Sequence, residues 1–307
     1  TCALPISRIG GVPRWGGGVV TTHTIPSLTD AEVTPIKVTP WRVLRAELLK
    51  IRTLRSTYYT LAITIAAMAF IGFIICWSTA NDWTQMRPHH RMRFNPLEDS
   101  LAGYQLAQLS IGVFGVLMTA GEYSTGMVRS TFAAVPKRLP VLWSKALVAA
   151  VVGFVTMLPS ALFAFFASQR TLSRVHIQTT WSGAIPVLKS LGAAQTLHVP
   201  RTVIGVAPYL TVVVVLGVGL GSILRNVAGA IATLVGVLLI LPVIASALPT
   251  TWGDRINKWL PSNAGQALLG LPSDNPQLSP WTGYLVFAAY AVGTLLIASW
   301  LLRRKDA

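Results

Sequence analysis

The stretch YYTLAITIAAMAFIGFIICWST, residues 58–79, contains no charged side chain. About 20 apolar residues are enough for a helix to cross the hydrocarbon core of a bilayer. Further stretches of this kind follow at residues 101–120, 141–168, 203–224, 227–248 and 281–302. The sequence therefore predicts an all-α polytopic membrane protein with six transmembrane helices.

The composition of the whole chain agrees with this fold class. Of its 307 residues, 52% are hydrophobic and 11% are charged, and the formal net charge is +15. The basic residues are spread over the loops and both ends rather than gathered in one patch. Anionic lipid headgroups are the expected counter-charge, so we expect the lipid bilayer as a partner and no nucleic acid.

The positions of Lys and Arg predict the orientation in the membrane. With the N-terminus inside, sixteen of the 25 basic residues lie on the cytoplasmic side and nine lie outside. Arg52 and Arg55 before the first span, and residues 303–305 after the last, are placed as the positive-inside rule requires. The loop 87–93 does not fit this rule, because its three arginines would lie outside the cell. On balance both termini are expected to be cytoplasmic.

The first 40 residues differ from the rest of the chain. They are rich in Gly, Pro and Thr, lack hydrophobic periodicity, and are expected to form a flexible tail ahead of a six-span domain at residues 41–307. Thr1–Ile6 is also what the bases ACG TGT GCT CTT CCG ATC encode, a run that resembles a sequencing-adapter end. We therefore expect the first residues to be artefactual.

An amphipathic segment precedes the first span. Trp41, Leu44, Leu48 and Ile51 share one side of a helix, although Glu47 interrupts that side. The segment predicts a helix lying on the inner leaflet; the alternative is a cytoplasmic extension of the first span. The residues assigned to this interfacial helix are Trp41, Arg45, Glu47, Lys50 and Arg52.

Features within the spans predict packing rather than chemistry. Gly217 and Gly221 form a GxxxG pair in the fourth span, which suits close approach of two membrane helices. Lys145, near the start of the third span, is expected to extend its amine to the lipid headgroups. Only Arg225 and Asn226 separate the fourth and fifth spans, which predicts a tight inner hairpin.

Between the fifth and sixth spans we expect two short helices at the outer leaflet. Tryptophans on an apolar face are typical of this position. The first helix is expected to carry Trp252, Ile256, Trp259 and Leu260 on its apolar face, and Asp254, Arg255, Asn257 and Lys258 on its polar face.

The sequence contains neither a GxxxxGK[ST] motif nor an HExxH motif, and its six apolar stretches hold no Asp, Glu or His. We therefore expect no catalytic, cofactor-binding or metal-binding site in this chain. The cytoplasmic loop 121–138 is the one segment with a possible binding role. The acidic residue Glu122 lies at its start, next to Gly121, and residues 127–134 favour a short helix. On composition alone, this loop is equally well a docking site for another protein or a solvated turn.

This loop resembles the coupling helix of the ABC type-2 permease family, the membrane subunits of ABC exporters, especially in actinobacteria. The matching positions are Glu122, Gly126, residues 127–134 and residues 136–138. Residues 47–57, 219–226 and 260–267 also resemble that family, and the likeness extends over about residues 41–307. The tail 1–40 is a departure, because the family does not require one.

The resemblance implies a permease that is not itself an enzyme. Two permeases would pair, as a homodimer or heterodimer, and two copies of a separate ATP-binding subunit would bind ATP and Mg. Coupling to those subunits would involve Glu122, Tyr123, Gly126, Met127, Arg129 and Ser130. The implied location is the bacterial plasma membrane, and the absence of charge in the spans favours export of an amphipathic or apolar substrate. The alternative is a non-transporting scaffold or receptor subunit that recruits a cytoplasmic partner.

Overall fold

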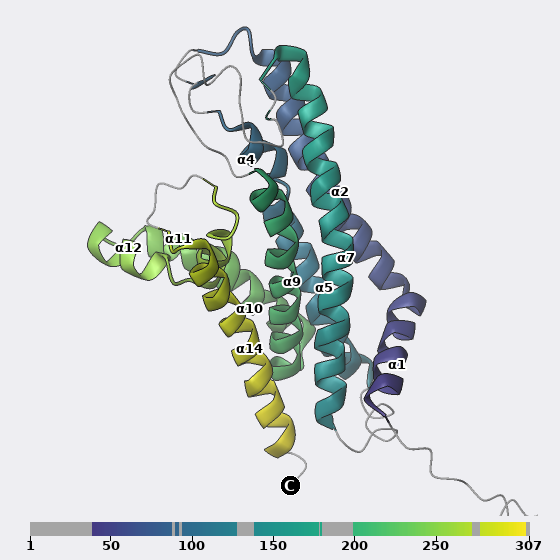
Figure 1. The fold of residues 1–307 in the computed structure, drawn as a ribbon. Coiled ribbons are helices and arrows are strands. Elements are labelled where there is room, and N and C mark those ends of the chain that lie inside the picture. The colour runs from purple at the N-terminus through teal and green to yellow at the C-terminus, as the bar shows by residue number, and fades with distance from the viewer. Residues whose placement is uncertain are drawn as a thin grey trace, which may run out of the picture. The chain divides into compact units, whose positions relative to one another are not determined.

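The computed structural model describes residues 39–87, 90–91, 94–127, 138–177, 179, 199–271 and 277–304. Within these ranges the chain is helical and contains no strand (Figure 1). The predicted tail, apart from its last two residues, lies outside them. The longer helices are α1 (Pro40–Thr53), α2 (Arg55–Asp82), α5 (Tyr104–Thr125), α7 (Arg138–Leu172), α9 (Val199–Leu224), α10 (Val227–Val235) and α14 (Pro280–Arg304). The shorter helices are α4 (Pro96–Leu101), α11 (Leu241–Ser246), α12 (Thr250–Asn257) and α13 (Pro261–Gln266).

Six of the described segments are long and apolar enough to cross a membrane, which confirms the prediction of a six-span, multi-pass protein. Each predicted span lies inside one of them, except that the fifth ends two residues later. The segments are Arg55–Asp82, Pro96–Thr125, Leu139–Val175, Val199–Leu224, Val227–Ser246 and Pro280–Arg304.

Helix α9 forms the centre of this bundle. It packs against α5, α7 and α14, and most of its side chains are buried. After Arg201 and Thr202 in its first turn, its sequence is largely apolar on every side, as expected of a helix surrounded by other helices. Tyr209 is fully buried in its middle, where its hydroxyl donates a hydrogen bond of 2.5 Å to Gln108 Oε1 of α5.

Small residues bring α9 and α5 close together. A Cβ atom added to Gly217 would lie 2.4 Å from the carbonyl oxygen of Gly112, and one on Gly221 would lie 2.3 Å from Thr119 Oγ1. Thr119 Oγ1 also donates a hydrogen bond of 3.2 Å to the carbonyl oxygen of Val218. The GxxxG pair therefore lies at a helix–helix contact with no space for larger side chains.

The fifth span contains a turn of π-helix. After α10, the backbone follows π-helical geometry over Gly236–Ile240 and then continues as α11. Pro242 is the second residue after the π turn, and its ring nitrogen cannot donate the hydrogen bond that an α-helix requires there. Before α10, Arg225 adopts a left-handed φ of 54°, and the Asn226 side chain accepts a hydrogen bond of 3.1 Å from the backbone N–H of Gly229.

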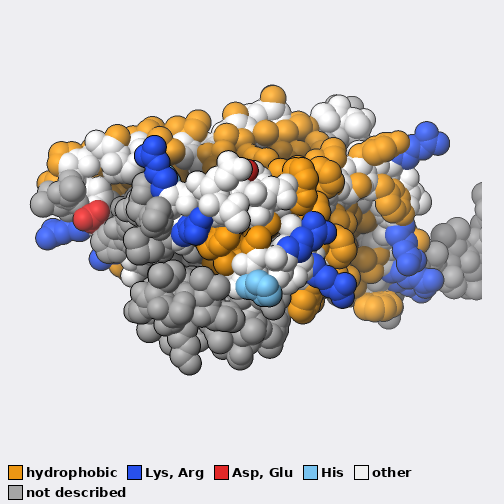
Figure 2. Space-filling model, turned by 90° about the horizontal axis from the view of Figure 1, so that it is seen from above, with side chains coloured by type: hydrophobic (Ala, Val, Ile, Leu, Met, Phe, Trp, Pro, Cys, Tyr) orange, Lys and Arg blue, Asp and Glu red, His pale blue; other side chains and the backbone are white. Residues whose placement is uncertain are grey.

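The outer surface suits a hydrocarbon environment. Hydrophobic side chains cover wide areas of the face shown in Figure 2, and Lys and Arg side chains stand in several separate groups on it. Large apolar residues such as Phe70, Phe163 and Val243 are each more than 60% exposed. Exposed residues of this kind are expected where a helix faces lipid.

Candidate functional site

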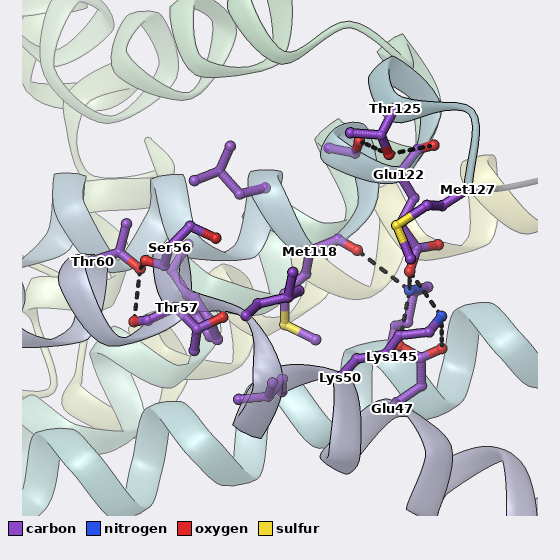
Figure 3. A pocket seen from close by; sticks show the side chains of 15 residues that line it. Glu47, Lys50, Ser56, Thr57, Thr60, Met118, Glu122, Thr125, Met127 and Lys145 are labelled. Carbon is purple, nitrogen blue, oxygen red and sulfur yellow. Dashed lines mark hydrogen bonds and ion pairs between the residues drawn. The ribbon is translucent and has the colours of Figure 1, made fainter.

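Four charged side chains meet where α1, the C-terminal end of α5 and the N-terminal end of α7 lie together (Figure 3). Lys145 Nζ is 2.9 Å from Glu47 Oε2 and 2.6 Å from Glu122 Oε1. Lys50 Nζ is 3.0 Å from Glu47 Oε1 and 3.0 Å from Glu122 Oε1. Each lysine therefore bridges both carboxylates, and we call these residues the four-charge cluster.

The four-charge cluster is mostly buried, and Lys50, whose side chain is 26% exposed, is its most accessible member. Glu47 is 3% exposed and Lys145 is 5% exposed. A buried charge is strongly unfavourable without a partner of opposite sign, and two acids with two bases leave no net charge here. The cluster therefore joins three helices: separating α5 or α7 would leave one charge uncompensated, and separating α1 would take one partner each from Glu122 and Lys145.

The face of α1 that packs against the bundle coincides only in part with the predicted apolar side. Val43, Glu47 and Ile51 are buried, whereas Trp41 is 70% exposed and Leu48 is exposed as well. Of the four predicted apolar residues, Ile51 and Leu44 pack against the bundle, and Trp41 and Leu48 remain exposed. That the segment lies on the inner leaflet stays a prediction. Leu54 is extended between Thr53 and Arg55, so α1 is a separate helix and not a continuation of α2.

The prediction that Lys145 extends to the lipid headgroups is wrong. Its amine is buried and donates hydrogen bonds to both carboxylates and, at 3.3 Å, to the carbonyl oxygen of Met118. Two acids from α1 and α5 compensate its charge inside the protein, so it has no need to reach the interface. The sequence showed a basic residue in an apolar stretch but not the acids that fold against it.

The pKa of Lys50 reflects its place in the four-charge cluster. Burial by itself lowers the pKa of this amine, but the charges of Glu47 and Glu122 and the hydrogen bonds to both outweigh burial. The net effect is a pKa above the ordinary value of 10.5. Lys50 therefore remains charged throughout the physiological pH range.

A cavity of about 190 Å³ adjoins the four-charge cluster. Ile51, Leu54, Phe114 and Met118 supply apolar walls, while the charged residues and the hydroxyl groups of α2 line the remainder (Figure 3). This cavity adjoins the junction of α1 and α2, because Leu54, the extended residue between these helices, is one of its walls. The junction of these two helices is consequently less tightly packed than the contact between α5 and α9.

The segment expected to dock a partner begins directly after the four-charge cluster. Glu122 and Tyr123 lie in the last turn of α5, and Gly126 ends that helix with a left-handed φ of 74°. Glycine adopts this conformation readily, which allows the chain to leave the helix sharply. Met127 lines the cavity, whereas Arg129 and Ser130 lie outside the described residues.

A second contact ties the end of α5 to the α9–α10 turn. The Arg225 guanidinium carbon lies 5.3 Å from the centre of the Tyr123 ring, within the range of a cation–π interaction. Residues 122 and 123 are thus both anchored to other helices. Of the sequence-predicted coupling residues, the structure describes Glu122, Tyr123, Gly126 and Met127, and those of the interfacial helix all lie in α1.

Comparisons with protein-family models, with curated proteins and with solved structures each found no match. The sequence reasoning identified Glu122, Glu47 and Lys50 but not the fact that they meet. One signal could have found the contact: an acid within the apolar arc of α1 and a lysine inside an apolar span both require partners.

Proposed function

We propose that this chain is the permease subunit of an ATP-driven ABC transporter, most similar in kind to the type-2 exporters. Two permeases, identical or different, would pair in a bacterial plasma membrane with both termini in the cytoplasm. A separate ATP-binding subunit would dock on each permease through the segment that begins at Glu122, and ATP and Mg would bind to that partner.

The observation that carries the proposal is the position of Glu122. It lies at the end of a spanning helix, directly before the candidate docking segment, and its carboxylate contacts Lys50 of α1 and Lys145 of α7. A force applied to the segment after α5 would therefore reach three helices together. A solvated turn has no need of an acid that is held between two lysines.

The distribution of charge supports an external energy source. Within the six apolar stretches of the sequence the only charged residue is Lys145, and it is paired with acids from other segments. Proton-driven transport usually depends on titratable groups within the spans. Energy delivered by a nucleotide-binding partner requires no such group, and transported substrate and nucleotide would alter each other's binding.

The test is co-expression with a neighbouring gene that encodes a Walker A protein, followed by purification and ATPase assay in lipid vesicles. Glu122→Ala is expected to leave the complex assembled but less stable, because Lys50 and Lys145 would then share only Glu47. Hydrolysis should no longer respond to the permease or drive transport. Arg129→Ala is expected to act in the same way.

Glu98→Ala provides the matched control. Glu98 is an exposed acid in α4, before the start of α5, and replacing it should leave coupling unchanged. Equal transport by wild type, Glu122→Ala and Arg129→Ala would refute the assignment of the coupling segment. Failure of any ATP-binding subunit to bind would instead support a scaffold or receptor subunit.

A further inference from the structure

Helix α12 has one buried face, which fixes it against α11. Gly253 and Asn257 are buried, and a Cβ atom on Gly253 would lie 3.0 Å from the carbonyl oxygen of Ala245. Asn257 also accepts a hydrogen bond of 3.1 Å at its carbonyl oxygen from Asn263 Nδ2. Figure 1 shows α11 and α12 beside the end of α14 that is opposite to the C-terminus.

The opposite face of α12 is uncovered and forms one wall of a groove. Trp252, Arg255 and Ile256 lie on this face of α12, Trp259 follows in the turn after the helix, and Trp252 is 68% exposed. With Leu260, and with Tyr290 from α14, they line a groove of about 560 Å³. The groove is therefore mainly aromatic, with one guanidinium group in it.

The predicted faces of this helix were wrong at two positions. Arg255 was expected on the polar face with Asn257, but it lines the groove beside the tryptophans, and Asn257 is 3% exposed. At about 100° per residue, Arg255 lies about 60° from Trp252 around the helix axis, whereas Asp254 lies about 160° from it. The sequence pattern separated polar from apolar residues, but the fold groups a cation with the aromatic rings.

Within the described part of the chain, no acidic side chain compensates the charge in the groove. No acidic residue among those described lines the groove, and Arg255 has no hydrogen bond or ion pair within the described part of the chain. A guanidinium group remains charged at any physiological pH and offers planar, paired donors that match a phosphate. The complement of this groove is an anionic phosphate attached to an apolar body.

We propose that this groove binds a phospholipid, with its phosphate on Arg255 and its acyl chains along Trp252, Trp259 and Tyr290. Tryptophan and tyrosine are favoured at the level of lipid headgroups, where one end of the ring is wet and the other apolar. The open shape suits a molecule that stays partly in the bilayer. The proposal requires a membrane but does not rest on the transport function.

The experiment is native mass spectrometry of the full chain, purified in detergent and titrated with a phosphatidylglycerol. Arg255→Gln should weaken the tightest lipid binding by about fivefold to tenfold, as loss of one basic contact to an anionic lipid implies. Lys258→Gln removes a neighbouring charge outside the groove and should bind like wild type. Trp259→Ala should also bind more weakly, because the chains lose an aromatic wall.

Two further probes separate lipid from other ligands. Diacylglycerol, which lacks the phosphate, should bind wild type and Arg255→Gln equally, and glycerol phosphate, which lacks the chains, should not compete. Equal affinity of wild type and Arg255→Gln for phosphatidylglycerol would overturn the proposal. An equal loss of affinity in Lys258→Gln would also overturn the proposal, because it would indicate general charge attraction. Competition by glycerol phosphate would overturn it too, because it would indicate a site for soluble phosphate.

Discussion

Lys145 Nζ lies 2.6 Å from Glu122 Oε1, so the start of one spanning segment is tied to the end of another. Glu47 approaches the same amine from α1 at 2.9 Å. Because all three side chains are largely buried, the contact is a structural joint rather than a surface ion pair. Surface ion pairs contribute little to stability, whereas removing one partner of a buried pair is strongly destabilising.

Replacement of Lys145 by Met should therefore destabilise the protein by about 3 kcal/mol, since Glu47 and Glu122 would share only Lys50. The double variant Lys145→Met with Glu122→Gln removes one charge of each sign and should be more stable than Lys145→Met alone. Midpoints of thermal unfolding in detergent would measure both effects. Simple additivity of the two single substitutions would contradict a coupled cluster.

The contribution of Lys50 to the stability of the four-charge cluster should change as its amine loses its proton, in strongly alkaline solution. The pKa of Lys50 is raised in the folded chain, so its contribution is fully present below the unfolded value of about 10.4 and declines as pH rises past the folded value. The difference in unfolding free energy between wild type and Lys50→Met should be constant from neutral pH up to the unfolded pKa of about 10.4. It should then shrink as the pH rises through the folded pKa. A difference that changes with pH between about 6 and 9 would contradict this assignment.

Gly217→Ala should destabilise the contact between α9 and α5 by about 1–3 kcal/mol, because the added methyl group would meet the backbone oxygen of Gly112. Gly293→Ala is the matched control in α14, since a Cβ atom there has no neighbour within 4 Å. The control should leave stability unchanged or raise it by up to about 1 kcal/mol. Chemical denaturation in detergent would separate the two, and equal effects would argue against close packing at Gly217.

Tyr209→Phe should cost about 1–3 kcal/mol of stability, because it leaves the buried Gln108 amide oxygen without its hydrogen-bond donor. Tyr284→Phe serves for comparison, since Tyr284 is only half-buried and its ring packs at the edge of the core. Unfolding of both variants in detergent provides the measurement. A similar loss in each would show that the hydroxyl of Tyr209 makes no special contribution.

The spans themselves could be predicted because length and hydrophobicity are properties of contiguous residues. The uncharged stretch 58–79 indicates a membrane helix without reference to any other part of the chain. The two-residue connection of Arg225 and Asn226 likewise fixes where α9 ends and α10 begins. Local chemistry was enough to predict these elements.

The candidate site could be predicted only in part, because it depends on contacts between distant segments. Glu122 was recognised from its position after a span, but its partners come from α1 and α7. Predictions from helical periodicity place charged residues on the solvent-exposed face of a helix. They fail where opposite charges pair with one another inside the fold. Lys145 and Arg255 were misjudged for related reasons, since neither environment can be inferred from neighbouring residues in the sequence.

The π-helical turn Gly236–Ile240 holds about one residue more than an α-helical turn of the same rotation. Deleting one residue within it would let the backbone close into regular α-helix, so α11 and α12 would keep their direction. Deleting one residue elsewhere in the fifth span would instead rotate α11 by about 100° about the helix axis. That rotation would carry α12 away from Tyr290 of α14 and dismantle the groove. A one-residue deletion in this span is thus tolerated at the π turn and costly elsewhere in it.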